Sequence, residues 1–277
     1  STLRTGLEKS RNLMTVRIAQ DLGVKKILDF SKKLNIYDDT DELLSISLGS
    51  AETTLLKLTS AYCSFVNGGK LINPILIDRI QDSEGNTIFN SEKRVCKKCE
   101  HISYLGSEVP KITDDFQRIF SSETAYQMVS LLEGAVQRGT GKKLRDLKLD
   151  LAGKTGTTNK NTDTWFVGFT SNLVVGVYVG YDEPKTLGKY ETGSKTALPI
   201  FKTFVKNSVK KKDARPFKVP ENIKMMVVDA KTGQRARFGS KETIIEAFKK
   251  ENVEKIYFND NYEIKYKITK KNILEFY

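Results

Sequence analysis

The clearest alternation of apolar segments and turn residues lies in residues 149–181, LDLAGKTGTTNKNTDTWFVGFTSNLVVGVYVGY. Within it, residues 164–170 and 173–181 are rich in Val, Phe, Tyr and Trp, the residue types that strands favour. Polar residues at 159–162 and 171–172 separate these runs and are typical of turns. The pattern predicts three consecutive antiparallel strands, the first of which carries a Lys-Thr-Gly tripeptide.

Apolar residues recur at helical spacing in four other segments, at residues 1–34, 43–66, 121–138 and 199–209. Gly23 interrupts the first segment, so we expect two helices there. A serine at 121 or 122 should cap the helix that follows it. We expect its buried stripe to consist of Ala125, Met128, Val129, Leu132 and Val136. The last helix should pack back on the sheet through Ile200, Phe201, Phe204 and Val205.

Shorter β-like runs occur at residues 74–80 and 86–89, which predict two short strands joined by a polar turn. The polar, Lys-rich residues 91–113 are expected to form a surface excursion.

The remaining residues suggest a division of the chain. A Lys-rich run begins a linker at residue 210, and short apolar runs follow at 224–277. We therefore predict an α+β fold, an antiparallel sheet flanked by helices, with a main domain at 1–212. Residues 213–277 should form the linker and a small β-rich C-terminal extension.

Composition narrows the classes of partner. The chain has 277 residues and a net charge of +12, which favours an anionic neighbour such as a membrane surface, a wall polymer or nucleic acid. No nucleic-acid motif accompanies the charge, so nucleic acid ranks last. The longest apolar run is about half of a membrane span. We see no signal peptide and no initiator Met, and expect an excised piece whose targeting the sequence does not give.

The Lys-Thr-Gly tripeptide at 154–156 is the first candidate site. Gly156 lacks a side chain, so a ligand can approach the strand closely. Thr155 and Thr157 lie two apart and share a face, so both hydroxyls can reach a ligand carboxylate beside the Lys154 charge. By itself Lys-Thr-Gly is a common turn tripeptide, and we interpret its second occurrence, at 231–233, in that way.

The second candidate is Ser10-Arg11-Asn12, an S-x-N tripeptide. Taken alone, it is typical of a polar turn or of a helix start, where Ser and Asn are favoured. Its functional interpretation depends on its pairing with the Lys154 strand.

Three residues of the excursion, Cys96, Cys99 and His101, are of metal-binding type. Structural zinc usually takes four ligands, and the one other cysteine, Cys63, lies in an apolar helical stretch. A local Cys96–Cys99 disulfide is the simplest interpretation in an oxidising compartment, with free thiols or a metal as alternatives. We expect no metal site and no cofactor. The single histidine also argues against a Ser-His-Asp hydrolase.

Five separated stretches, in the same order along the chain, resemble the transpeptidase domain of bifunctional, class A penicillin-binding proteins of the 1A type. They are residues 6–20 (GLEKSRNLMTVRIAQ), 60–69 (SAYCSFVNGG), 133–141 (EGAVQRGTG), 153–169 (GKTGTTNKNTDTWFVGF) and 176–188 (GVYVGYDEPKTLG). Lys-Thr-Gly and S-x-N belong to the signature set of such proteins. The resemblance covers roughly residues 1–211. It implies the penicillin-binding protein and serine β-lactamase fold and a peptidoglycan D,D-transpeptidase activity.

The resemblance also implies catalytic roles. Ser10 would relay a proton to the leaving nitrogen, and Asn12 would hold the motif lysine and the substrate amide. Lys154 would supply positive potential for a deprotonated neighbour and for the terminal carboxylate of the substrate.

The same resemblance makes the first strand the substrate-binding strand. Thr155 and Thr157 would bind the carboxylate, and the Thr157 N–H would form half of an oxyanion hole. Gly156 and Thr158 complete the expected substrate-binding set.

One family motif is missing. The S-x-x-K that holds the nucleophile should precede Ser10, whereas the formal match at residues 208–211 follows Lys154 in a Lys-rich run, and we reject it. We expect the nucleophile, its lysine, a glycosyltransferase domain and further strands beyond residues 173–181 to lie outside this chain, which should be inactive by itself.

The implied partners are stem peptides ending in D-Ala-D-Ala and β-lactam antibiotics, with no nucleic acid. The expected location is the periplasmic face of the bacterial inner membrane, with membrane association through the missing N-terminal part. Two alternatives stay open: a D,D-carboxypeptidase or β-lactamase on the same fold, and a non-catalytic wall-binding module.

Overall fold

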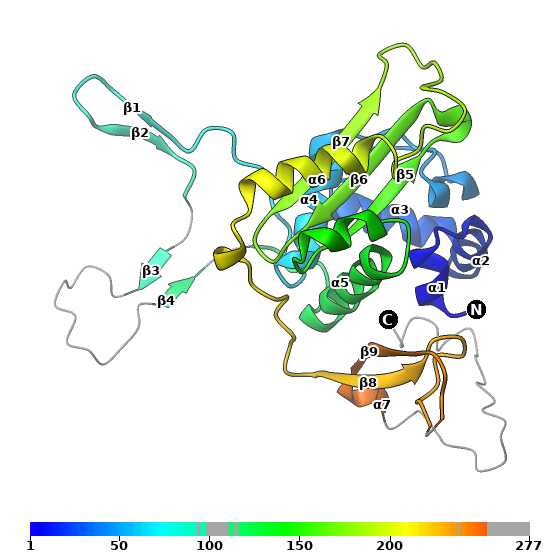
Figure 1. The fold of residues 1–277 in the computed structure, drawn as a ribbon. Helices are drawn as coiled ribbons and strands as arrows, with labels where there is room; N and C mark the ends of the chain where they lie inside the picture. The colour runs from blue at the N-terminus through cyan, green and yellow to red at the C-terminus, as the bar shows by residue number, and fades with distance from the viewer. Residues whose placement is uncertain (93–94, 98–110, 114–115, 238, 254–277) are drawn as a thin grey trace.

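The computed structural model describes residues 1–92, 95–97, 111–113, 116–237 and 239–253. A three-stranded sheet with helices packed around it forms the body of this part, and small two-stranded sheets lie outside it (Figure 1). In chain order the elements are α1 (Leu3–Glu8), α2 (Asn12–Leu22), α3 (Val24–Lys33), η1 (Leu44–Leu48), α4 (Leu55–Val66), β1 (Arg79–Gln81), β2 (Thr87–Asn90), β3 (Val95–Lys97), β4 (Lys111–Thr113), α5 (Ser122–Gln137), η2 (Lys142–Leu147), β5 (Ala152–Thr157), η3 (Asn159–Asn161), β6 (Asp163–Phe169), β7 (Val174–Gly180), α6 (Ala197–Ser208), η4 (Lys211–Asp213), β8 (Ile223–Asp229), β9 (Thr243–Lys249) and α7 (Lys250–Val253).

The body sheet has the order β5-β6-β7, with both pairs antiparallel, so the three predicted strands are confirmed. Lys154 on β5 lies opposite Val167 on β6. Within the described residues, β5 and β7 are the two edges of this sheet. One edge is therefore the strand that carries the Lys-Thr-Gly tripeptide.

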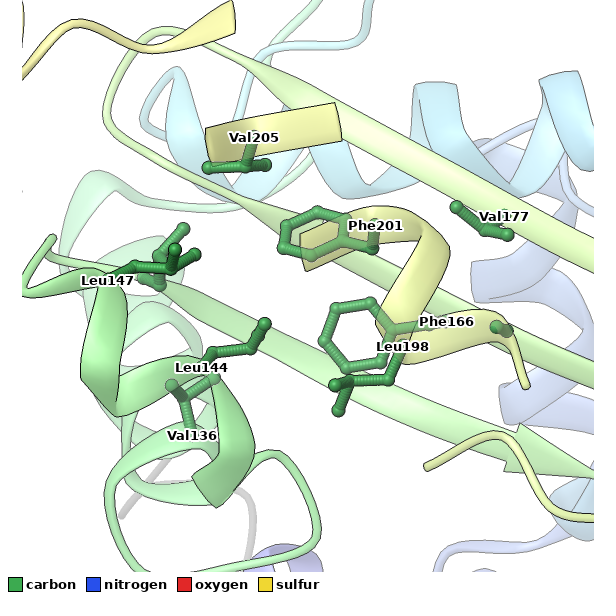
Figure 2. Close-up of a cluster of buried hydrophobic side chains, with 10 residues drawn as sticks. Val136, Leu144, Leu147, Phe166, Val177, Leu198, Phe201 and Val205 are labelled. Atoms are coloured by element: carbon green, nitrogen blue, oxygen red, sulfur yellow. The ribbon is translucent and has the colours of Figure 1, made fainter. Parts of the chain in front are cut away.

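Helices cover both faces of the sheet. Successive side chains of a strand point to opposite faces, so each strand contributes residues to both layers of the core. Phe166 packs against α6, where Leu198 and Phe201 are fully buried (Figure 2). Phe169, three residues further along β6, packs on the other face against α5 and α4. The face of β6 that each side chain occupies thus decides which helices cover it.

The expected stripe of α5 is confirmed, since four of its members are buried and Met128 packs against the cluster that contains Val129 and Leu132. Ser121 is the N-cap, and its hydroxyl accepts from the Thr124 N–H at 3.2 Å.

Two of the four α6 residues that were expected to pack on the sheet do not do so. Phe201 and Val205 are fully buried, whereas Ile200 and Phe204 are 52% and 48% exposed. Residues 201 and 205 are one helical turn apart and share the face that meets the sheet. Residues 200 and 204 form a second pair, which is turned away from it.

Three other boundaries differ from the prediction. Residues 1–34 form three helices and not two, because the chain turns between α1 and α2 at Ser10. The predicted helix at 43–66 is divided into η1 and α4, since Gly49 adopts the left-handed conformation that ends η1. The first predicted short strand, at 74–80, overlaps β1 only at its end. The second, at 86–89, nearly coincides with β2.

In the predicted C-terminal extension, β8 and β9 form an antiparallel hairpin. β8 coincides with the first of the short apolar runs expected in 224–277, MMVVDA at 225–230, whereas no such run marked β9. The later β-like runs lie outside the described residues, as do Cys99 and His101, so the disulfide prediction stays untested. No helix in the part that the structure describes is long and apolar enough to span a membrane.

Candidate active site

The C-terminal end of α1 fixes the position of Ser10. The Arg11 N–H donates to the Gly6 carbonyl at 2.8 Å, and the Ser10 N–H donates to the Leu7 carbonyl at 3.1 Å. This is the hydrogen-bond pattern of a Schellman helix end, and Ser10 occupies the left-handed position with a φ of 50°. Glycine normally takes this position, because a side chain there is strained. Non-glycine residues held in this way concentrate at functional sites.

Lys154 reaches Ser10 from β5. Its Nζ donates to Ser10 Oγ and also to the Thr155 carbonyl oxygen, the latter at 2.9 Å. Because the hydroxyl oxygen of Ser10 accepts from the ammonium, its own hydrogen remains available to a ligand. The structure therefore brings together two of the three predicted catalytic residues, from positions 144 apart in sequence.

Lys154 keeps its charge available for a ligand. No carboxylate in the described part of the chain forms an ion pair with it. Burial lowers the pKa of Lys154 from its ordinary value to about 8, because removal from water disfavours the charged form. At neutral pH the group is still mainly an ammonium, and it can bind an anion and exchange a proton.

Thr140 is a member of the site that the sequence interpretation missed. Its hydroxyl lies 2.9 Å from the hydroxyl of Thr155, and its N–H donates to the Glu8 carbonyl at 3.2 Å. Gly139 allows this approach, since a Cβ there would lie 2.1 Å from the Glu8 carbonyl oxygen. The signal was the RGTG run at 138–141, which belongs to one of the five stretches that carry the family resemblance but was given no role in the site.

The far end of β5 meets the loop before α6. Thr157 Oγ1 accepts from the Gly193 N–H at 3.1 Å. A Cβ at Gly193 would lie 2.5 Å from the Gly156 carbonyl oxygen, so only glycine fits against this strand. Thr158 lies in the turn into β6, where its hydroxyl accepts from the Asp163 N–H at 2.8 Å. Thr155 and Thr157 thus have separate polar partners.

Asn12 begins α2 and is exposed. Its side chain forms no hydrogen bond with Ser10 or Lys154 among the described residues. Asn12 is two residues from Ser10 along the chain, but the structure does not join it to the contact between Lys154 and Ser10.

The second Lys-Thr-Gly, at 231–233, lies in the turn after β8. Asp229 Oδ1 accepts from the N–H groups of Lys231 and Thr232, at 3.0 and 2.9 Å, and from the Thr232 hydroxyl at 3.0 Å. This tripeptide closes a turn, which is how the sequence analysis interpreted it.

The geometry defines the chemical capacity of the site. An ammonium with a lowered pKa, a serine hydroxyl free to donate and an edge strand with two threonines lie at one place. Such a site can bind the carboxylate end of an extended peptide and deliver a proton to a leaving group.

The family Penicillin binding protein transpeptidase domain matches residues 1–206. The chain belongs to this family, and its fold is the penicillin-binding protein and β-lactamase-like fold.

Individual relatives agree with this assignment. The chain is 44% identical over 270 residues to penicillin-binding protein 1A of Rickettsia prowazekii, covering 95% of this chain. The crystal structure of penicillin-binding protein 1A from Haemophilus influenzae matches 88% of this chain and 39% of that chain, with a TM-score of 0.74 and 31% identity. The PonA1 protein of Mycobacterium tuberculosis, solved in complex with penicillin V, matches 79% of this chain and 59% of that chain, with a TM-score of 0.61 and 20% identity. The last likeness concerns the fold alone.

The coverage is unequal. The chain spans 34% of the length of the Rickettsia relative, and the same share of its Rickettsia typhi counterpart.

Proposed function

We propose that this chain is part of a peptidoglycan D,D-transpeptidase that crosslinks stem peptides in cell-wall synthesis through a serine acyl-enzyme. The contact of Lys154 Nζ with Ser10 Oγ beside the edge strand β5 carries the proposal. Family membership and the relatives named penicillin-binding protein 1A support it.

The reaction has two steps. A serine hydroxyl attacks the carbonyl carbon of the penultimate D-alanine, the C–N bond to the terminal D-alanine breaks, and the serine proton passes to the leaving amine. An amine of a neighbouring stem then attacks the ester, so that a new amide forms, the ester C–O bond breaks and the serine regains a proton. The nucleophile and its lysine are expected upstream of Ser1, in an S-x-x-K.

Ser10 is suited to the proton transfer of the first step. Its oxygen accepts from the Lys154 ammonium, so its hydrogen can be donated to the leaving nitrogen as the ammonium replaces it. Asn12, two residues away, would hold the substrate amide.

Substrate binding would use β5. The unpaired edge of the strand offers backbone groups to an extended stem peptide at Gly156, and Thr155 and Thr157 offer hydroxyls to its terminal carboxylate. Thr158 would support this strand through its turn, and the Thr157 N–H would form part of the oxyanion hole. A β-lactam carries a carboxylate in a similar place, so β-lactams would acylate the same serine, as membership of the penicillin-binding protein family supports.

The remaining parts of the assignment follow from the family. We propose a bifunctional parent with a glycosyltransferase, attached to the membrane by its upstream part and acting at the periplasmic face of the bacterial inner membrane. The net charge of +12 suits an anionic polymer or membrane surface. Within the chain, the main domain would end near residue 212 and the extension would begin at 213.

The experiment is to treat the full-length protein with a fluorescent penicillin and to locate the adduct by mass spectrometry. We expect the labelled serine upstream of Ser1, and no adduct on the isolated 277-residue chain. A labelled serine within residues 1–277, such as Ser10, would overturn the assignment.

Product analysis separates the alternatives. With stem pentapeptide substrate, we expect D-alanine release together with crosslinked dimers. Release without dimers would favour a carboxypeptidase, and rapid turnover of penicillin a β-lactamase. Wall binding that is lost in salt, with no adduct on the full-length protein, would favour a binding module.

The pH dependence of acylation is a further expected result. The ammonium of Lys154 attracts the ligand carboxylate, and its pKa is lowered to about 8. The acylation rate constant of the full-length protein should therefore fall as the pH rises through about 8. With an ordinary lysine, whose pKa is roughly 10.4, the fall would come at a higher pH. The Lys154→Arg variant keeps its charge and should be slower but lack this fall. An identical alkaline fall in both proteins would contradict the assignment to Lys154.

A further inference from the structure

The helix that places Ser10 is too short to hold its own position. α1 has 6 residues, and isolated helices of this length are not stable in water. Its orientation therefore depends on its tertiary contacts. Two of its side chains, Arg4 and Glu8, are buried and charged, which is costly unless they are paired.

The main partner of Arg4 comes from the opposite end of the chain. Arg4 Nε donates to Glu246 Oε2 at 2.5 Å, and Arg4 Nη2 donates to Glu246 Oε1. This is the two-pronged arrangement in which a guanidinium binds a carboxylate most strongly. The side chain of Arg4 is 3% exposed and that of Glu246 is 14% exposed, so water replaces neither partner easily.

The remaining contacts of Arg4 tie this pair to α5 and to the site. Its Nη1 donates to the Ser130 carbonyl at 2.8 Å, and its Nη2 to the Ser130 hydroxyl at 2.9 Å. Glu8 lies beside Arg4 and accepts from Arg138 Nη2 at 2.6 Å. The charges thus alternate along one row, from Glu246 through Arg4 and Glu8 to Arg138.

This row of charges is connected to the candidate active site through Glu8. The Glu8 carbonyl accepts from the Thr140 N–H, and the Thr140 hydroxyl is bonded to that of Thr155. Two residues after Glu8, the Schellman end of α1 holds Ser10 against Lys154. A shift of α1 would therefore move Ser10 relative to β5.

The β8–β9 hairpin is held in place by other contacts as well. Gln127 on α5 donates to the Ala247 carbonyl at 3.1 Å, and Asn222 donates to Glu123 at 3.3 Å. The turn at Gly233 lies against Thr2, the N-cap of α1. Figure 1 shows the hairpin beneath α1 and α5. This hairpin lies beyond the residues matched by the family.

We infer that Glu246 is a positioning residue, through which the C-terminal hairpin holds α1, and with it Ser10, in the geometry that acylation needs. The inference rests on the proposed function. It assigns to the β8–β9 hairpin a part in the reaction that acts through Arg4 and α1.

The test uses the full-length protein and the Glu246→Gln variant, which keeps the shape of the side chain and removes its charge. The acylation rate constant should fall on the order of 10-fold, since a small misplacement of a catalytic group is enough to cause such a loss. Glu242→Gln is the matched control. Glu242 lies in the same hairpin and forms an exposed pair with Lys231 at 3.8 Å, so its rate should not change.

A double-mutant cycle separates positioning from general loss of structure. In a Ser10→Ala background, Glu246→Gln should cause almost no further loss, because the group it positions is absent. Hydrogen exchange should also become faster at the amides of Ser10 and Arg11. If Glu246→Gln lowers the yield of folded protein, Glu246→Asp takes its place in the same cycle.

The outcomes are distinct for the two proposals. Additive losses in the cycle, or an unchanged rate and unchanged exchange, would overturn the role of Glu246 and leave the proposed function standing. A wild-type protein that is never acylated would overturn the proposed function. Unchanged hydrogen exchange in Glu246→Gln would then also overturn the inference that Glu246 holds α1 and Ser10 in place.

Discussion

Replacing Lys154 by alanine should slow acylation of the full-length protein by a fluorescent penicillin on the order of 10²-fold or more. The substitution removes the ammonium that donates to Ser10 Oγ and that attracts the ligand carboxylate. Ser10→Ala and Asn12→Ala should each cause a loss of the same order, because Ser10 would relay the proton and Asn12 would hold the substrate amide. The measurement is the second-order rate constant of labelling at pH 7.

The chain supplies its own control in the second Lys-Thr-Gly. Thr232 closes a surface turn through Asp229, and Thr232→Ala should leave the labelling rate unchanged. Equal losses from Lys154→Ala and Thr232→Ala would mean that the wrong tripeptide was assigned to the site.

Truncation of Phe201 should lower the free energy of unfolding by about 3–5 kcal/mol, the usual cost of replacing a buried phenylalanine with alanine. Phe201 is fully buried between α6 and the sheet, with its ring centroid 4.7 Å from that of Phe166. Figure 2 shows both rings in the same cluster. Removal of the ring would leave a cavity under the strand that runs beside β5. Urea unfolding of the wild type and of Phe201→Ala, followed by circular dichroism, measures the difference.

Phe204 provides the matched comparison, because it is the same residue type on the same helix. It is 48% exposed, so we expect Phe204→Ala to cost much less, about 1 kcal/mol or below. Similar losses for both substitutions would mean that another element covers Phe204 under the conditions of the measurement.

The local elements of this fold could be predicted because their signals are local. Val and aromatic residues between turns marked β6 and β7, and a serine cap with an apolar stripe marked α5. The interpretation failed where local pattern was ambiguous. Ile200 and Phe204 are as apolar as Phe201, and only the position of the sheet decides which face of α6 is buried. The division of the chain at residue 212 stays a prediction.

The candidate site shows the same limit. Motifs named Ser10, Asn12, Lys154 and the threonines of β5, but they did not name Thr140, because its hydroxyl gains a role only when α5 ends against β5. The left-handed conformation of Ser10 was also not visible, since it depends on how α1 ends.

The sequence by itself determined the order of the three strands, the two tripeptide motifs and the resemblance to the family. Each of these depends on short stretches of residues that are neighbours along the chain. Only the tertiary structure decided that Lys154 meets Ser10, 144 residues away, and that Glu246 meets Arg4 across 242 residues. Such pairs carry no local signal. They form because tertiary packing brings distant segments of the chain together. For Arg4 and Glu246, burial then makes each charge necessary to the other.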